Sequence, residues 1–276
     1  TASNNTAVGH QAGLSNTTGA ENVANGVQAL YSNTTGGYST AVGYRALFYN
    51  TTASNNTAVG YQAGYANTTG TPNVWVGYLA GNDATTATEN TFIGQRAGEN
   101  YTTGGINTAV GSYSLNAIGG TGTGTLNAAF GKNALLTNTS GSQNTAIGTY
   151  ALALNTTASN NTAVGYQAGY SNITGAYLTA TGYFALKSST ADGNTAMGYN
   201  AAGATSSGAY NTAQGFSALA ANSSGGYNTA LGASALNSNT TSSNNTAVGY
   251  KAGYSNTTGT GNTGIGGEAG LSLTTS

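Results

Sequence analysis

A short alternation of polar and apolar residues recurs along the whole chain and is its dominant pattern. In the block Asn-Thr-Ala-Val-Gly-Tyr, the β-forming residues Thr and Val flank an Ala and precede a Gly, as in Asn56–Tyr61 and Asn161–Tyr166. Apolar runs never reach the length of a helix, and frequent glycines interrupt them, so helix is disfavoured throughout. The pattern therefore predicts one short β-strand in each block.

The block returns every 17 residues, and the glycine that follows Val marks its register. The sixteen anchor glycines are Gly9, Gly26, Gly43, Gly60, Gly77, Gly94, Gly111, Gly131, Gly148, Gly165, Gly182, Gly198, Gly215, Gly232, Gly249 and Gly266. A three-residue insertion precedes Gly131, within Gly119–Thr125, and one residue is missing before Gly198. Repeats this short must stack on their neighbours to bury anything. The sequence thus predicts an all-β protein: a β-solenoid, or parallel β-roll, of sixteen 17-residue coils that forms one continuous array over residues 1–276.

Equivalent positions of the coils predict columns of stacked side chains. Asn stands four residues before the anchor glycine in fourteen coils, and we expect its amides to hydrogen-bond from coil to coil. Ala stands two residues before the glycine in thirteen coils and three residues after it in fifteen. The glycine itself, present in all sixteen, indicates a positive φ or a close backbone approach.

The inside and outside of the coil follow from strand alternation. Successive side chains point to opposite faces, so Thr and Val share one face and Ala takes the other. We expect the two Ala columns to line a thin interior and the Thr and Val columns to form an exposed apolar stripe. Trp75 and Phe92, which stand in an Ala column, favour the reverse assignment.

Contacts with copies of the same chain are the partners that this pattern predicts. An apolar stripe along sixteen coils exceeds what a monomer normally exposes, which favours lateral association, most simply as a trimer. The motif also persists from Asn5 to Asn262 without a capping sequence, although open solenoid ends normally need caps. We therefore expect head-to-tail stacking or a longer parent protein.

The repeated block resembles a known signature. Asn-Thr-Ala-Val-Gly-Tyr-x-Ala, as in Asn56–Ala63 and Asn161–Ala168, is similar to the Asn-Ser-Val-Ala-Ile-Gly-x-x-Ala signature of trimeric autotransporter adhesin heads (YadA-like) and to related repeats of phage tail fibres. The resemblance implies a left-handed parallel β-roll, trimerised along its length, that binds host or matrix surfaces. The chain departs from the family in its longer coil and in the Thr that mostly replaces an apolar residue before Ala.

Composition narrows the classes of function. Charged residues are 4% of the chain and the net charge is −1, so five Lys and Arg residues cannot form a patch that neutralises nucleic-acid phosphates. The absence of Cys excludes disulfides and thiolate metal sites. No apolar stretch reaches the roughly 18–20 residues that span a bilayer, so we expect no membrane insertion. We expect an extracellular location, on a cell or virion surface.

The sequence gives no support for a catalytic, metal-binding or cofactor-binding site. The single His, His10, stands at a position that is usually Tyr and is interpreted as a surface substitution. The insertion Gly-Gly-Thr-Gly-Thr-Gly-Thr lacks the Lys and the strand–loop–helix setting of a phosphate-binding loop, which favours a bulged turn. Calcium-binding solenoids need an Asp in every repeat, and only Asp83 and Asp192 occur. We therefore predict no enzymatic activity, no bound metal and no cofactor.

Two features could carry ligands or modifications. Coils five and six hold Trp75, Asp83, Glu89, Phe92 and Arg96, a combination that can stack on a sugar and hydrogen-bond to it; the alternative is that these coils simply tolerate variety. Asn seven residues after the anchor glycine also opens an Asn-x-Ser/Thr sequon in ten coils. These sequons have two alternative interpretations. They could carry occasional glycans, or their Asn and Thr side chains could simply hydrogen-bond to local backbone groups of a turn. The ten positions are Asn16, Asn33, Asn50, Asn67, Asn138, Asn155, Asn172, Asn222, Asn239 and Asn256.

The preferred function is therefore a structural subunit of an extracellular fibre or adhesin shaft. The alternative is a segment of an adhesin or tail fibre that binds surface glycans, with tyrosine columns such as Tyr61, Tyr78 and Tyr166 as stacking surfaces. An ice-binding protein is less favoured, because an ice-binding face needs paired Thr columns and the second column here is mostly Val or Ile.

Overall fold

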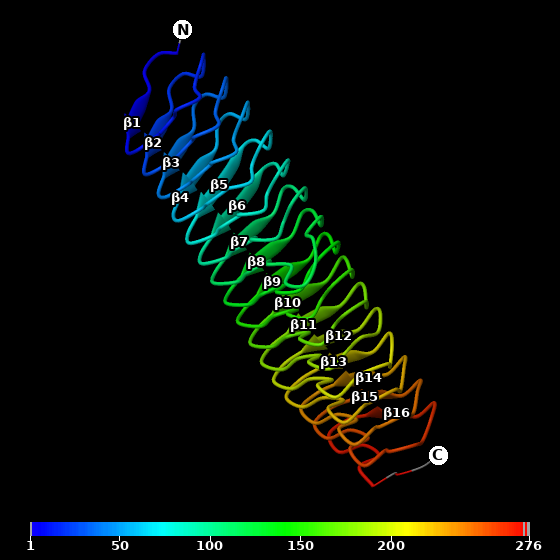
Figure 1. Ribbon diagram of the computed structural model, residues 1–276. Coiled ribbons are helices and arrows are strands. Elements are labelled where there is room, and N and C mark those ends of the chain that lie inside the picture. Colours follow the sequence, from blue (N-terminus) through cyan, green and yellow to red (C-terminus); the bar gives the residue numbers. More distant parts are fainter. Residues whose placement is uncertain (1, 273, 275–276) are drawn as a thin grey trace. The chain divides into compact units, whose positions relative to one another are not determined.

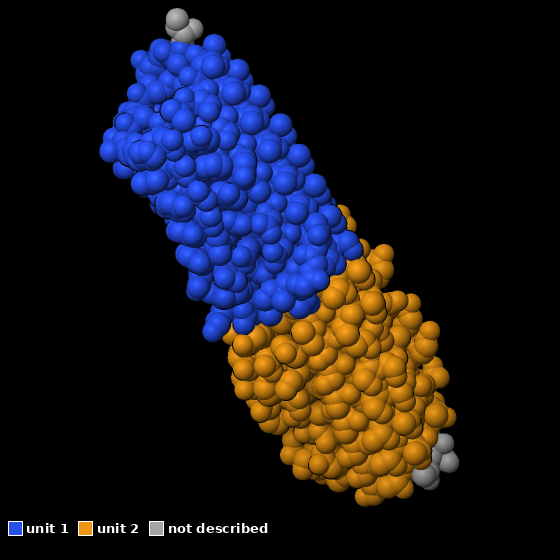
Figure 2. Space-filling model, viewed as in Figure 1, with its two compact units in different colours: residues 1–142 blue, residues 143–276 orange. Residues whose placement is uncertain are grey.

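The computed structural model describes residues 2–272 and 274, and within them it is an all-β solenoid without helices, as predicted. The chain divides into two compact units, residues 1–142 and 143–276, which Figure 2 colours separately and which are treated one at a time below. Residues 1, 273, 275 and 276 of the predicted array lie outside the described part.

The first unit contains eight parallel strands, each paired with the next along the chain (Figure 1). Identical positions pair across the coils: Ala41 of one strand lies opposite Ala58 of the next. The strands are β1 (Thr6–Val8), β2 (Val23–Asn25), β3 (Thr40–Val42), β4 (Thr57–Val59), β5 (Asn73–Val76), β6 (Asn90–Ile93), β7 (Thr108–Val110) and β8 (Ala128–Phe130).

The second unit repeats this arrangement with eight further parallel strands in chain order (Figure 1). The deletion before Gly198 leaves the register intact, since Ala180 still pairs with Ala196. The strands are β9 (Thr145–Ile147), β10 (Thr162–Val164), β11 (Thr179–Thr181), β12 (Thr195–Met197), β13 (Thr212–Gln214), β14 (Thr229–Leu231), β15 (Thr246–Val248) and β16 (Thr263–Ile265).

The anchor glycine ends each strand, and both expectations for it are confirmed. Gly43 has a φ of 129°, in the range that L side chains rarely adopt. A Cβ on Gly43 would overlap the carbonyl oxygen of Gly60, the next anchor. The ladder nevertheless continues past the strand, because the backbone N–H of Gly60 donates to Val42 O over 2.8 Å.

The turns of the coil use left-handed backbone at residues other than glycine, which the sequence did not indicate. In the third coil, Tyr38, Arg45 and Leu47 have φ values of 56°, 52° and 52°. Equivalent residues of most other coils share this conformation. Left-handed backbone costs roughly 1–2 kcal/mol for an ordinary L residue, so other contacts of the coil must offset it.

The interior is lined by the two Ala columns, as expected. Ala41 and Ala46 are fully buried, and so is Leu47, which belongs to a third interior column four residues after the anchor glycine. The Thr and Val positions of the strands are half-buried or exposed, which places them outside. The reverse assignment suggested by Trp75 and Phe92 is wrong.

Two columns of Asn complete the interior and confirm the predicted amide ladders. The Oδ1 atom of Asn56 accepts the backbone N–H of Asn73 in the next coil over 2.9 Å. Its Nδ2 atom donates to the carbonyl oxygen of Gly70 at 2.9 Å, which also accepts Nδ2 of Asn67 at 3.2 Å. The carbonyl oxygen of Gly70 thus accepts a hydrogen bond from each of the two Asn columns and links two sides of the same coil. Burial of these polar groups is tolerated because they are hydrogen-bonded.

Large aromatic residues enter the interior where the third column is glycine instead of leucine. Trp75 and Phe92 are fully buried at Ala positions. A Cβ on Gly64 or Gly81 would overlap the indole of Trp75, and a Cβ on Gly98 would overlap the ring of Phe92. The missing side chains therefore provide the space for the rings, and the volume of the core is conserved.

The insertion before β8 forms a bulged turn, as predicted. Gly120 N–H donates to Ala117 O over 3.0 Å and closes the bulge. Tyr101 is fully buried in place of the usual Asn, and a Cβ on Gly122 would overlap its ring. Its hydroxyl accepts a hydrogen bond from Nδ2 of Asn138 at 2.6 Å. The tyrosine thus fills the interior beside the bulge.

Candidate interaction surface

The outer side of the strands carries a repeated apolar column in each unit. We define the strand face as the Thr and Val/Ile columns, three residues and one residue before each anchor glycine. Several members of the second column are exposed, among them Val8, Ile93, Phe130, Ile147, Met197 and Leu231. The Ala residues between the two columns are buried, whereas the members of the two columns are half-buried or exposed, so the interior is lined from the Ala side of the strands. The apolar column continues along the strands of each unit, interrupted by Asn25 in the first unit and by Thr181 and Gln214 in the second.

Beside the strand face, the residue after the anchor glycine is Tyr in several consecutive coils, and these tyrosines form ladders. Tyr44, Tyr61 and Tyr78 stack in the first unit, with ring centroids 5.3 and 5.2 Å apart and interplanar angles of 15° and 16°. In the second unit, Tyr166, Tyr183 and Tyr199 stack at 5.2 and 5.4 Å, with angles of 19° and 3°. Phe216 extends this second ladder, 5.1 Å from Tyr199.

The stacking geometry decides what the tyrosine ladders offer to a ligand. Nearly parallel rings at these distances direct their faces toward one another along the column, which is the offset stacking that aromatic pairs prefer. The ring of Tyr61, and likewise the ring of Tyr183, therefore has a neighbouring aromatic ring stacked on each of its two faces. Ring edges and hydroxyls remain for contacts with other molecules.

An aromatic cluster lies around Arg45 in coils two to four of the first unit. Phe48 stacks on Tyr31 at 4.9 Å and on Tyr65 at 5.3 Å, and Tyr49 packs edge-on against Phe48 at 4.8 Å. The Arg45 guanidinium lies 5.2 Å from the centroid of Phe48, a cation–π distance. Burial raises the pKa of the Tyr65 hydroxyl, and its interaction with Tyr49 raises it further. We call these five residues the Arg45 cluster; the 17-residue spacing of Tyr31, Phe48 and Tyr65 is visible in the sequence, whereas the packing of Arg45 and Tyr49 against Phe48 is not.

The sugar-binding patch that was one of two alternatives for coils five and six is not formed. Trp75 and Phe92 are completely buried, so neither ring can stack on a ligand. Asp83 and Glu89 are exposed, and partial burial raises the pKa of Asp83. Arg96 forms an ion pair with Glu99, with Nη1 and Oε2 3.7 Å apart. The prediction was wrong because the glycines of the third interior column give both rings space inside the coil.

The sequon asparagines lie inside the coil and perform the turn chemistry that was one of the two alternatives. Asn50 donates through Nδ2 to Oδ1 of Asn33 at 3.0 Å and to the carbonyl of Ala53 at 2.9 Å, and its own Oδ1 accepts from Asn67. Nine of the ten sequon positions are buried, and Asn16 is half-buried. Glycan attachment at a buried copy would require the turn to open.

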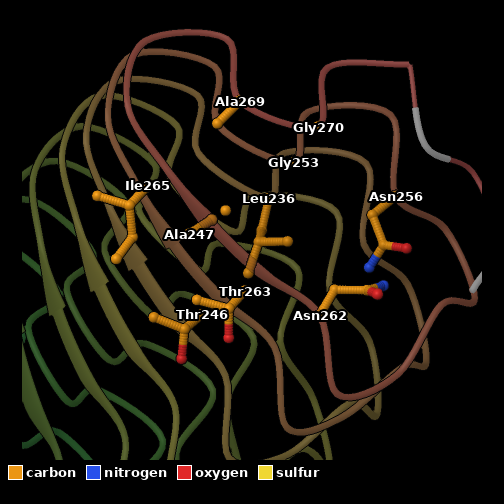
Figure 3. A pocket seen from close by; sticks show the side chains of 11 residues that line it. Leu236, Thr246, Ala247, Gly253, Asn256, Asn262, Thr263, Ile265, Ala269 and Gly270 are labelled. Atoms are coloured by element: carbon orange, nitrogen blue, oxygen red, sulfur yellow. The ribbon is translucent and has the colours of Figure 1, made fainter.

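A cavity of about 290 Å³ lies in the last coils of the second unit (Figure 3). Gly253, Gly264 and Gly270 border it at positions that other coils fill with Leu or Ala. Figure 3 shows Leu236 and Ala247 within the coil and Asn256 and Asn262 directed toward each other across it. The cavity is thus an underfilled part of the core, lined by apolar and amide groups, and it contains no charged side chain.

The remaining candidates form no chemical site. His10 is exposed, as expected. Asp192 accepts the backbone N–H of Ala176 at 2.8 Å. Residues 2–272 and 274 contain no group of three or more His, Asp or Glu side chains arranged to hold a metal. Over the same residues, no helix has the length and hydropathy that a bilayer crossing requires.

Comparison with known proteins adds no relative. No family model matches the chain, and neither a curated protein nor a solved structure does so. The inference of function therefore depends on the surface and core described above.

Proposed function

We propose that this chain is a structural subunit of an extracellular fibre or adhesin shaft, which associates through the strand face with copies of itself. The observation that carries the proposal is the strand face: Val, Ile, Phe, Met or Leu stands on it, half-buried or exposed, in thirteen of the sixteen coils, with Asn25, Thr181 and Gln214 as the exceptions. Contiguous apolar surface of this kind marks an interaction site in soluble proteins. The repeat's resemblance to adhesin heads and tail-fibre repeats supports the same function.

The chemistry of the face suits a second copy of the chain. Identical columns recur every 17 residues, so a symmetric partner matches coil by coil. The face also lacks the charges that would specify a nucleic acid or an acidic partner, because the chain has only eleven charged residues. Valine, threonine and tyrosine side chains pack together with little loss of conformational entropy.

The test is the mass of the full chain in solution. We expect light scattering and sedimentation to give a multiple of the mass of one chain. Replacing Val42, Val59 and Val76 together with lysine should convert the protein to a monomer, since like charges would face each other across the interface. Mass per unit length of the assembly then separates lateral association from end-to-end stacking.

A matched control uses the column nine residues after the anchor glycine, where Thr35, Thr52 and Thr69 are exposed. The same three lysines placed there should leave the assembly unchanged. A monomeric parent protein, or equal effects of the two triple variants, would overturn the proposal.

A second candidate function is recognition of a surface glycan through the Arg45 cluster. Tyr49 is exposed and packs edge-on against Phe48, whose ring also lies against the Arg45 guanidinium, a group that can donate to sugar hydroxyls. Binding on a glycan array should disappear with Tyr49→Ala. It should persist with Tyr177→Ala, which removes a more exposed tyrosine that has no ring partner among the described residues. Absence of binding to any glycan would leave the structural function alone.

A further inference from the structure

Consecutive coils place tyrosine hydroxyls and rings side by side at five points. The pairs are Tyr44–Tyr61, Tyr61–Tyr78, Tyr166–Tyr183, Tyr183–Tyr199 and Tyr210–Tyr227, with ring centroids 5.2–5.4 Å apart and interplanar angles of 3–19°. All eight rings are exposed, from 38% for Tyr44 to 63% for Tyr227. Parallel strands in register hold the two members of each pair in equivalent positions.

We propose that these pairs are sites of oxidative cross-linking, in which o,o′-dityrosine joins one coil covalently to the next. The co-reactant is a one-electron oxidant of the peroxidase class with hydrogen peroxide. Cysteine is absent, so the chain cannot use disulfides for this purpose. The product would be a series of covalent links along the solenoid, each closing a loop of one coil.

The reaction balances on two phenols and one peroxide. Each phenol loses one electron and its hydroxyl proton and becomes a phenoxyl radical, whose unpaired spin is shared with the Cε carbons next to the oxygen. A bond forms between one Cε of each ring. Each of these carbons then releases its hydrogen as a proton, and the phenol oxygen takes up a proton, which restores both aromatic rings. The two electrons and two protons lost overall reduce hydrogen peroxide to two molecules of water.

The fold favours coupling between neighbouring coils over other outcomes. Two radicals held in contact react as an intramolecular pair, which has a large effective concentration. The rings already lie parallel, so rotation about the two side-chain torsions brings one Cε toward the other. Exposure gives the oxidant access from one side, while the hydrogen-bonded ladder keeps the backbones in register.

The chain contains its own comparison residues. Tyr38 and Tyr177 are exposed by 61% and 68%, more than most ladder members, yet neither stacks with another ring among the described residues. Their neighbours one coil away in the same column are not aromatic. If exposure alone governed oxidation, these two residues would react at least as readily as the ladder tyrosines.

The experiment oxidises the full chain at low concentration with peroxidase and limiting hydrogen peroxide. Dityrosine fluorescence follows the reaction, and mass spectrometry of a digest identifies the linked peptides. Mixing ¹⁴N- and ¹⁵N-labelled chains before oxidation distinguishes links within a chain from links between chains. We expect links at the five pairs, within single chains, at least tenfold more abundant than links that involve Tyr38 or Tyr177.

Two variants test the geometry without disturbing the stack. Tyr61→Phe should abolish both links of the first ladder and leave the second ladder unchanged. Phe216→Tyr should add a new link between position 216 and Tyr199, because the rings at these positions are already stacked at 5.1 Å with an interplanar angle of 9°.

Three results would overturn the proposal. They are links distributed without preference for the five pairs, links found mainly between differently labelled chains, and failure of Phe216→Tyr to add a link while the variant keeps its β circular dichroism spectrum. None of these bears on fibre assembly, which is read from the mass of the unoxidised protein.

Discussion

Moving side-chain volume from position 75 to position 81 tests whether the total volume of the core side chains determines stability. Trp75 and Gly81 are the two residues to exchange. Trp75→Ala should destabilise the first unit by about 3–5 kcal/mol, the range for a fully buried aromatic side chain truncated to alanine. Gly81→Leu alone should also be destabilising, by about 1–3 kcal/mol or more, because its side chain would overlap the indole. Together, the two changes should compensate.

The reason is that the double variant recreates a pair present elsewhere in the chain. Ala41 and Leu47 occupy the same two positions in the third coil, both fully buried. Leu47 adopts a φ of 52°, so leucine tolerates the left-handed backbone that Gly81 has at 57°. The double variant also removes the Trp75 indole N–H, a buried donor without a partner. We expect it to lie within about 2 kcal/mol of the parent, a coupling energy of at least about 2 kcal/mol.

The assay is denaturant unfolding followed by circular dichroism, since Trp75 is the only tryptophan and its fluorescence is lost in the variant. Repeat proteins need not unfold in two states, so hydrogen exchange of peptides from coils four to six provides a local measurement. As a control, Gly13→Leu makes the same change in the first coil, where the nearest atom to an added Cβ is 4.0 Å away. Its effect should add to that of Trp75→Ala. Additive effects for Trp75 and Gly81 would refute the volume argument.

Three further substitutions test the turn, the amide ladder and the buried tyrosine. Tyr177→Asn should stabilise the protein by about 0.5–1 kcal/mol in thermal unfolding, because asparagine tolerates the φ of 60° and the Tyr177 side chain is largely exposed. A lower melting temperature would contradict this. Asn50→Ala should cost about 2–4 kcal/mol through the lost amide bonds, whereas Thr52→Ala, which destroys the same sequon at an exposed position, should change stability by less than about 0.5 kcal/mol. Burial raises the pKa of the Tyr101 hydroxyl, so above pH ~10 only the unfolded chain loses this proton. The free energy of unfolding should then fall by about 1.4 kcal/mol per pH unit relative to a Tyr101→Phe variant, and parallel pH profiles for the two proteins would exclude this role.

The repeat by itself determines the fold. A 17-residue period with near-invariant Ala, Asn and Gly requires equivalent residues to stack, so the strands and their parallel register were predictable. The Ala interior was expected as well, but Trp75 and Phe92 left the reverse assignment open until burial decided it. The Asn ladders were predictable for the same reason, because an identical amide one coil away is always the nearest partner. Each of these features depends on identity between copies, and identity can be read from a sequence.

The departures from the repeat were decided by the tertiary structure alone. Trp75 looked like a ligand-binding residue because its chemistry permits stacking, and only the space beside Gly64 and Gly81 shows that it belongs to the core. The interior leucines such as Leu47 could not be foreseen in left-handed backbone, since burial and coil geometry override local preference there.

The same division applies to the surface. Tyrosines at 17-residue intervals predict a column, whereas the tilt of the rings decides whether their faces meet a ligand or one another. The sequons left glycosylation and turn chemistry as alternatives, whereas burial of the asparagine amide assigns that group to the turn. The sequence determines which residues stack, because stacking follows from the period. Which atoms remain available depends on volumes and hydrogen bonds supplied by the neighbouring coil, and these exist only in the folded chain.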